Sequence, residues 1–157
     1  STALMYPLVR QGERFPLVAP QAEEFVIGTP HDDTDLYRAC LEGVAFTEKL
    51  CYDLLADLGA PLGERVYVTG GGSHSPLWTQ IRADVLGRPL ARPRLPESAF
   101  GAALLAATGT LYPDVSAAAR SMVQVEHTVE PDPAMAAHYA AQYARFVEAC
   151  RTRGYMS

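Results

Sequence analysis

The segment VYVTGGGSHSPLW, residues 66–78, is the part of the sequence best suited to ligand chemistry. Alternating apolar residues lead into three consecutive glycines, and a serine–proline pair then opens a predicted helix. Glycines at the end of a strand let the backbone come close to a ligand, and the N–H groups at a helix start favour negative charge. The pattern indicates a phosphate or a ribose as the ligand, although a tight connection that binds nothing has the same pattern.

Two stricter nucleotide-binding motifs are excluded at this segment. GGGSHSPLW does not have the spacing GxGxxG of the dinucleotide-binding fingerprint, and the sequence contains no GK[ST] of a P-loop. Pro76 has no N–H group, which weakens the interpretation of the helix start as a pure phosphate clamp. Taken alone, the turn predicts a ligand site without identifying the ligand.

The composition narrows the classes of partner. The 157 residues are enough for one domain, and a net charge of −5 without a basic run argues against nucleic acid and anionic membranes. No apolar run approaches the roughly 20 residues of a membrane span, and no signal peptide opens the chain. Cys40, Cys51 and Cys150 lack metal-type spacing and are odd in number, so we expect core thiols in a reducing compartment, the cytoplasm.

The elements around the glycines alternate between strands and helices, which predicts an α/β fold. Strands are expected at residues 24–28, 65–69, 88–94 and 123–131, and helices at 34–58, 76–86, 98–108, 114–122 and 132–153. Thr34 and Ser98 are the expected N-caps of two of these helices. The two prolines of strand 88–94 cannot donate ladder hydrogen bonds, so we expect this strand at the edge of its sheet.

One apolar stripe is expected on the longest helix. Its members recur at steps of three and four residues or their multiples: Leu36, Cys40, Val44, Leu50, Leu54 and Leu58. This stripe predicts the face that the helix buries.

Several runs resemble one known family when they are read together. They are GERFP (12–16), LYRACLEGVAF (36–46), VYVTGGGSHSPLWTQIRADVLGRPL (66–90), ESAFGAALLAATGT (97–110) and the closing PDPAMAAHYAAQYARF. In this order they resemble the C-terminal domain of the FGGY carbohydrate kinases, especially the xylulokinase-like branch. The resemblance implies a ribonuclease H-like, actin-like ATPase fold, with a mixed sheet flanked by helices, in which ATP and a sugar meet in a cleft between two domains.

The resemblance also implies which residues approach the nucleotide. The adenosine-binding motif of the family corresponds to Gly70, Gly71 and Gly72, followed by Ser73 and Ser75. The glycine turn would approach the α-phosphate and ribose, with Ser75 near the adenine. A pure N-cap role for Ser75 is an equally good interpretation.

Two other residues are expected to face the cleft. Trp78 could stack on adenine, but packing against the neighbouring helix is the better interpretation. Arg14, in the GERFP loop, could meet a phosphate or form an ion pair within its own loop. His74 is expected to be an exposed loop residue, and Gly101 is expected to permit close packing of its helix.

The resemblance further implies what this chain lacks. In the family, the catalytic Asp and most sugar-binding residues belong to the N-terminal domain, and no acidic residue here matches the catalytic motif. We therefore nominate no catalytic and no metal-binding residue, and expect this chain to be one part of an enzyme that uses ATP and Mg²⁺ to phosphorylate a sugar, most plausibly a pentulose. We also consider a homodimer. The alternative is a non-catalytic interaction or regulatory module that retains the kinase fold.

Overall fold

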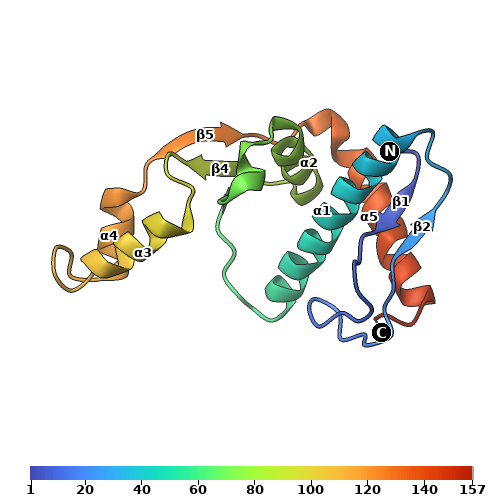
Figure 1. Ribbon diagram of the computed structural model, residues 1–157, viewed down its shortest axis with the longest axis horizontal. Helices are drawn as coiled ribbons and strands as arrows, with labels where there is room; N and C mark the ends of the chain where they lie inside the picture. Colours follow the sequence, from blue (N-terminus) through green and yellow to red (C-terminus); the bar gives the residue numbers. More distant parts are fainter. Residues whose placement is uncertain (157) are drawn as a thin grey trace. The chain divides into compact units, whose positions relative to one another are not determined.

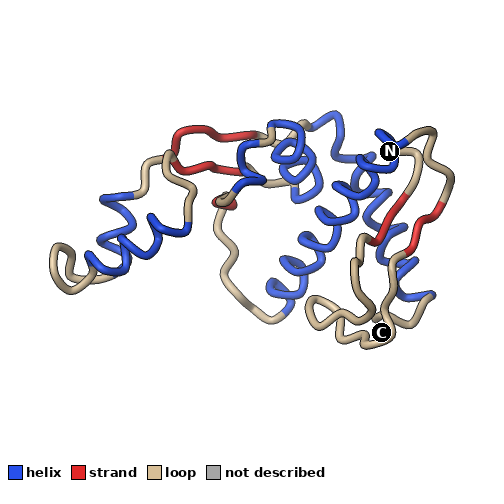
Figure 2. Tube along the Cα trace, viewed as in Figure 1, coloured by secondary structure: helices blue, strands red, loops and turns tan. Residues whose placement is uncertain are grey.

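The computed structural model describes residues 1–156, which form two compact units (Figure 1, Figure 2). The first unit contains Ser1–Gly63, Asp84–Gly87 and the end of the chain from Pro131. The second unit contains Glu64–Ala83 and Arg88–Glu130. The prediction of one domain from the length stays a prediction, and each unit is described by itself. None of the helices in the described part of the chain is long and apolar enough to cross a membrane.

The first unit packs a two-stranded sheet against two helices. Strand β1 (Leu4–Tyr6) pairs antiparallel with β2 (Phe25–Ile27). β1 contacts both α1 (Asp33–Asp57) and α5 (Ala136–Thr152), and the short 3-10 helix η2 (Pro133–Met135) precedes α5. The rings of Tyr6, Phe46 and Phe146 are fully buried, with the Phe46 and Phe146 centroids 5.5 Å apart. These three aromatic side chains, one each from β1, α1 and α5, form the core of the unit.

The start of α1 differs from the sequence expectation. The N-cap is Asp32 and not Thr34, because the Asp32 carboxylate accepts a hydrogen bond of 2.8 Å from the Asp35 amide. Both residue types cap helices well, so their identity alone does not decide between neighbouring positions.

The buried face of α1 also differs from the predicted apolar stripe. Leu50 is buried as expected, but Val44 and Leu58 are 41% and 74% exposed. Small residues beside Phe46 face the core instead, among them Ala39 and Gly43. Hydrophobicity alone misplaced this face because close packing against β1 requires small side chains.

The three cysteines are free thiols with different burial. Cys150 is fully buried, and burial raises the pKa of its thiol to about 11. Cys40 and Cys51 are half-buried, and burial, with smaller contributions from nearby carboxylates, raises the pKa of the Cys51 thiol. The expectation of core thiols is therefore confirmed for Cys150.

These differences predict the order of alkylation. Because the thiolate is the nucleophile, a thiol with a raised pKa stays protonated and unreactive at about pH 8. Iodoacetamide should modify Cys40 first and leave Cys150 unmodified in the native chain, while all three cysteines react in urea. Peptide mass spectrometry measures this order, and early modification of Cys150 would contradict the packing around α5.

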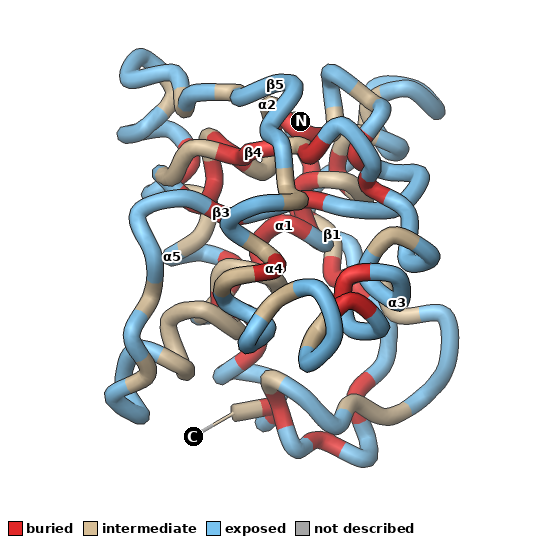
Figure 3. Tube along the Cα trace, turned by 90° about the vertical axis from the view of Figure 1, so that its left-hand side faces the viewer, coloured by how far each residue is buried: buried red, intermediate tan, exposed pale blue. Residues whose placement is uncertain are grey.

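The second unit is built on a mixed three-stranded sheet. β4 (Leu90–Pro93) lies between β3 (Val66–Tyr67), to which it is parallel, and β5 (Val125–Val129), to which it is antiparallel. β3 is followed by the 3-10 helix η1 (Gly71–His74) and by the start of α2 (Pro76–Leu86). Between β4 and β5 the chain forms α3 (Ser98–Ala107) and α4 (Val115–Met122), which contact each other. Leu90 and Ala91 are buried, and Figure 3 shows β4 among the buried parts of the chain. The mixed sheet with its helices confirms the α/β prediction.

Two expectations for this unit are wrong. The strand at 88–94 is central and not at an edge, because its prolines flank the paired backbone: Pro89 contributes its carbonyl to the Val66 amide, and Pro93 lies at an irregularity in the pairing with β5. Helix α3 has Glu97 and not Ser98 at its N-cap, without a side-chain capping bond. A proline at the end of a strand therefore does not exclude a central position.

Candidate functional site

The glycine turn, residues Gly70–Gly72, begins where β3 ends. The Val68 amide still pairs with the Ala91 carbonyl at 2.9 Å, and the Gly70 amide then donates to the Pro96 carbonyl at 2.9 Å. Gly70 has φ 76°, a left-handed backbone conformation that residues other than glycine rarely adopt. The chain therefore leaves the sheet sharply and enters η1 at Gly71.

Space is open in front of the first two glycines. A Cβ placed on Gly70 or Gly71 would meet no atom within 4 Å, whereas one on Gly72 would meet the Trp78 indole at 3.2 Å. Gly71 and Gly72 open η1, and in a 3-10 helix the first N–H groups have no partner inside the helix. The turn thus combines backbone donors with unfilled space at the carboxyl end of a parallel strand, where ligands bind in α/β folds.

The two serines of the motif have clear structural roles. The Ser73 side chain is buried and its hydroxyl donates to the Gly70 carbonyl at 2.6 Å, which closes the turn. The Ser75 hydroxyl accepts from the Trp78 amide at 3.2 Å, so Ser75 caps α2 as the serine–proline pair predicts. Contact of either serine with a nucleotide stays a prediction.

Trp78 lies against the glycine turn. Its indole is half-buried beside Gly72, and the Arg82 guanidinium carbon is 5.6 Å from the ring centroid. The ring therefore packs against the turn and an arginine of its own helix, and packing against the neighbouring helix stays a prediction. Stacking on adenine stays a prediction.

A cavity of about 640 Å³ lies along the end of β3, α3 and α4, with Thr69 as its lining residue next to the turn. Thr69, Glu97, Ser98 and Gly101 contribute to its lining, and the remaining lining is mostly apolar. The expectation that Gly101 permits close packing is wrong, because a Cβ at Gly101 would meet nothing within 4 Å. Gly101 instead lines this cavity, and the absence of a side chain leaves space there. The sequence gives no signal for this role beyond the position of Gly101 on the helix.

The GERFP loop belongs to the first unit. The Glu13 carboxylate accepts from the Tyr6 hydroxyl at 3.1 Å and from the Arg14 amide at 2.9 Å, which shapes the loop. Within the described residues, the Arg14 side chain forms no ion pair with Glu13. The structure therefore does not support the loop ion pair, and a phosphate contact of Arg14 stays a prediction.

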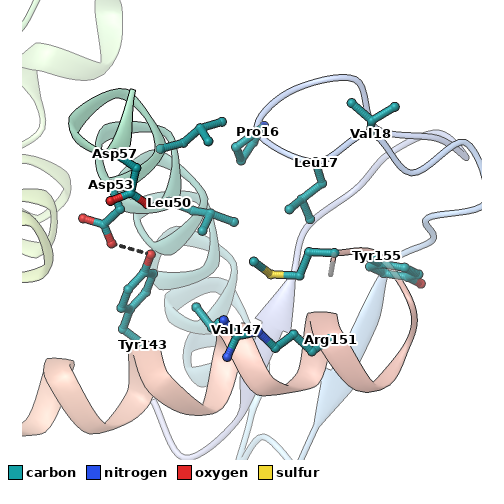
Figure 4. A pocket seen from close by; sticks show the side chains of 12 residues that line it. Pro16, Leu17, Val18, Leu50, Asp53, Asp57, Tyr143, Val147, Arg151 and Tyr155 are labelled. Atoms are coloured by element: carbon teal, nitrogen blue, oxygen red, sulfur yellow. Dashed lines mark hydrogen bonds between the residues drawn. The ribbon is translucent and has the colours of Figure 1, made fainter. Parts of the chain in front are cut away.

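A second cavity, of about 690 Å³, lies in the first unit between α1, α5 and the loop at Pro16 (Figure 4). Its polar wall includes Asp53 and Tyr143, whose hydroxyl donates to the Asp53 carboxylate at 2.7 Å. Burial and the neighbouring carboxylate raise the pKa of Tyr143, so this hydroxyl remains a donor. None of the lining residues belongs to the glycine turn, and the sequence analysis singled out none of them. This cavity is thus not at the predicted site.

No metal-binding group is found in the described part of the chain: nowhere do three or more His, Cys, Asp or Glu side chains gather so that they could hold an ion. Mg²⁺ in a nucleotide site usually takes its ligands from phosphate oxygens, water and one or two carboxylates.

The second unit is an α/β unit with an open glycine turn at a strand end, and comparison with known proteins gives the family of the chain. The sequence profile of the C-terminal domain of the FGGY family of carbohydrate kinases matches residues 2–110. This chain belongs to that family, and its fold is the actin-like ATPase fold of the FGGY sugar kinases.

Individual relatives agree with the family. The uncharacterized sugar kinase YgcE of Escherichia coli (strain K12) is 40% identical over 108 residues, which are 68% of this chain and 22% of that protein. Ribulokinase of Mycolicibacterium smegmatis is 37% identical over 142 residues, which are 87% of this chain and 25% of that protein. The crystal structure of gluconate kinase from Lactobacillus acidophilus superposes with a TM-score of 0.83 at 22% identity, over 96% of this chain and 31% of that one. Other relatives include glycerol kinases and L-xylulose kinases.

The chain thus spans about a quarter of the length of these curated relatives. The comparisons establish the family and the fold. The activity of the whole protein, its sugar and the residues that contact its nucleotide are proposals.

Proposed function

We propose that this chain forms the adenosine- and phosphate-binding side of an ATP-dependent carbohydrate kinase. The whole enzyme transfers the γ-phosphoryl group of ATP to a sugar hydroxyl. The observation that carries this proposal is the open glycine turn at the end of β3, where Gly70 and Gly71 leave space that any side chain would fill. The turn occurs in a chain that belongs to the FGGY carbohydrate kinases.

The residues of the turn suit a nucleotide. The Gly71 and Gly72 amides offer donors to a phosphate or ribose oxygen, and the absence of side chains permits close approach. The cavity next to Thr69 has a mostly apolar lining, as purine sites commonly have, and its polar groups include Thr69, Ser98, Glu97 and Arg120. Arg14 and Trp78 are secondary candidates for contact.

The contribution of this chain to the reaction is binding and orientation. Phosphoryl transfer is accelerated mainly by positioning and by stabilising the charge on the transferred group, with a base that accepts the proton of the attacking hydroxyl. Mg²⁺ bound with the nucleotide would neutralise part of the negative charge of the phosphates. We assign neither the base nor a metal ligand to this chain, and infer that both belong to the N-terminal domain of the whole enzyme.

We infer that the sugar is a pentulose. The alignment with ribulokinase spans 87% of this chain, and that with a probable L-xylulose kinase spans 74%. Glycerol kinases and a gluconate kinase match as well, and glycerol and gluconate are therefore the alternative acceptors.

The isolated chain should bind ATP weakly and transfer no phosphoryl group. We expect a dissociation constant on the order of a millimolar, since half a site gives few contacts. Calorimetry with ATP, and an ADP-release assay with xylulose, ribulose, gluconate and glycerol, measure the two properties. Sub-micromolar affinity or measurable turnover would contradict the division of labour between two domains.

The alternative function is a non-catalytic module that kept the fold. One observation favours it: β3 lies at the edge of its sheet, with Tyr67 55% exposed, and an open edge can pair with another chain. The coding sequence upstream of this chain decides between the two functions. A preceding domain without an acidic residue in the kinase catalytic motif would support the module and remove the basis for the kinase.

A further inference from the structure

Glu97 contributes an unused acceptor to the cavity that adjoins the glycine turn. It is the N-cap residue of α3, but its side chain makes no capping hydrogen bond. Among residues 1–156, this carboxylate forms no ion pair and no side-chain hydrogen bond. An ionised carboxylate only accepts hydrogen bonds, so Glu97 offers this capacity to a group that enters the cavity.

The backbone holds Glu97 close to the glycine turn. The Gly70 amide donates to the Pro96 carbonyl at 2.9 Å, and Glu97 is the next residue in the chain. The turn, the cavity and Glu97 all belong to the second unit. A nucleotide with a phosphate or its ribose at Gly70 and Gly71 would therefore extend its base toward Glu97.

The face of α3 that lines the cavity has one polar end and an apolar remainder. Glu97, Gly101 and Leu104 lie on this face at steps of four and three residues, and all three belong to the lining. No atom lies within 4 Å of a Cβ placed on Gly101, so space for a ring remains beside the helix. Tyr67 of β3 and Val123 of α4 add apolar surface to the lining. The cavity thus suits a flat apolar ring that carries a hydrogen-bond donor at its edge.

We propose that Glu97 determines the base specificity of the nucleotide site: its carboxylate accepts a hydrogen bond from the exocyclic amino group of the purine. This proposal rests on the proposed nucleotide-binding function of the turn. In ATP the group is the 6-amino group of adenine, and the ring lies in the cavity beside Gly101. Glu97 takes no part in the transfer of the phosphoryl group.

The other polar groups of the lining are weaker candidates for this contact. Arg120 has donors only and cannot accept from an amino group. Thr69 and Ser98 offer neutral hydroxyl oxygens, and hydrogen bonds to an ionised acceptor are stronger than those to a neutral one. Glu97 is therefore the group in this lining that distinguishes best between a base with an amino group and one without it.

Three nucleotides separate the contributions of the base. Purine riboside 5′-triphosphate has a hydrogen atom in place of the 6-amino group of ATP and is otherwise the same molecule. GTP carries its amino group on the other side of the ring and offers a different set of donors and acceptors. The dissociation constant of each is measured by NMR titration of the isotopically labelled full chain.

One variant and a matched control assign the effect to Glu97. Glu97→Ala removes the acceptor, and the chain should still fold because no capping bond is lost. Glu64→Ala removes an exposed carboxylate of the same unit that precedes β3, at the opposite end of that strand from Thr69. The readout is the ratio of two affinities, because the loss of a negative charge changes the binding of every triphosphate in the same direction.

The original chain should bind ATP about fivefold more tightly than purine riboside 5′-triphosphate, a typical factor for one hydrogen bond. The Glu97→Ala chain should bind the two nucleotides equally. The Glu64→Ala chain should keep the fivefold preference, since its substitution lies away from the cavity.

The outcomes that overturn the inference differ from those that overturn the proposed function. Equal affinities of the original chain for the two nucleotides, or an unchanged preference in Glu97→Ala, would refute the role of Glu97. Tighter binding of GTP than of ATP would refute the assignment to adenine. If Glu97→Ala does not fold, the comparison of nucleotides on the original chain decides. If ATP shifts no amide near the glycine turn, the proposed nucleotide site itself is wrong.

Discussion

Replacing Gly71 with valine should weaken the binding of ATP about tenfold or more, equivalent to about 1.4 kcal/mol, without unfolding the chain. The valine side chain would fill the space in front of the turn, where no protein atom lies within 4 Å of the added Cβ. Gly71 is not among the glycines with positive φ, so its backbone conformation accepts a side chain. In the whole enzyme, the same substitution should raise the KM for ATP far more than the KM for the sugar.

The free energy of unfolding of the Gly71→Val chain is the control, because it shows whether a loss of ATP binding comes from unfolding. A urea titration should give a free energy of unfolding within about 1 kcal/mol of that of the original chain, because an exposed substitution without a clash costs little. Unchanged ATP affinity, or equal rises in both KM values, would contradict the assignment of the turn.

Replacing Gly43 with alanine should destabilise the first unit by about 3 kcal/mol or more, the upper range for overpacked cores. A Cβ on Gly43 would overlap the Met5 carbonyl oxygen and would lie 2.8 Å from Cδ of Pro7. Backbone of β1 cannot move away without disturbing its pairing with β2 and the Tyr6 ring in the core. Alanine favours a helix over glycine by about 0.5–1 kcal/mol, which is too small to offset this clash.

Gly101→Ala provides the matched comparison. It is the same substitution inside a helix, but nothing lies within 4 Å of the added Cβ. It should therefore stabilise the chain by about 0.5–1 kcal/mol through helix propensity. Chemical denaturation of both variants measures the difference, and a Gly43→Ala chain as stable as the Gly101→Ala chain would refute the close contact of α1 with β1.

Local signals in the sequence predicted the elements near the glycine turn well. The serine–proline pair at residues 75–76 begins α2 as expected, since Ser75 supplies the capping oxygen and Pro76 needs no N–H partner. Gly70 marks the turn because its positive φ is a local property of the backbone. These features depend on only a few consecutive residues, and the sequence therefore reveals them.

Features that depend on distant parts of the chain could not be predicted in the same way. β1 was not expected, because its three residues become a strand only through pairing with β2. The central position of β4 depends on β3 and β5 on either side, and Gly43 faces the core only because β1 lies there. The contact between the side chains of Arg92 on β4 and His74 on η1 joins residues 18 positions apart, and no spacing in the sequence indicates it.

The location of the ATP site is tested most directly by an NMR titration of the isotopically labelled chain with ATP. The proposal predicts that amide shifts concentrate at residues 69–78 and 97–101, around the glycine turn and the adjoining cavity. Shifts that gather instead around Asp53 and Tyr143, at the cavity of the first unit, would contradict it. The same holds for the absence of any shift at about 10 mM ATP, a concentration well above the dissociation constant expected for half a site.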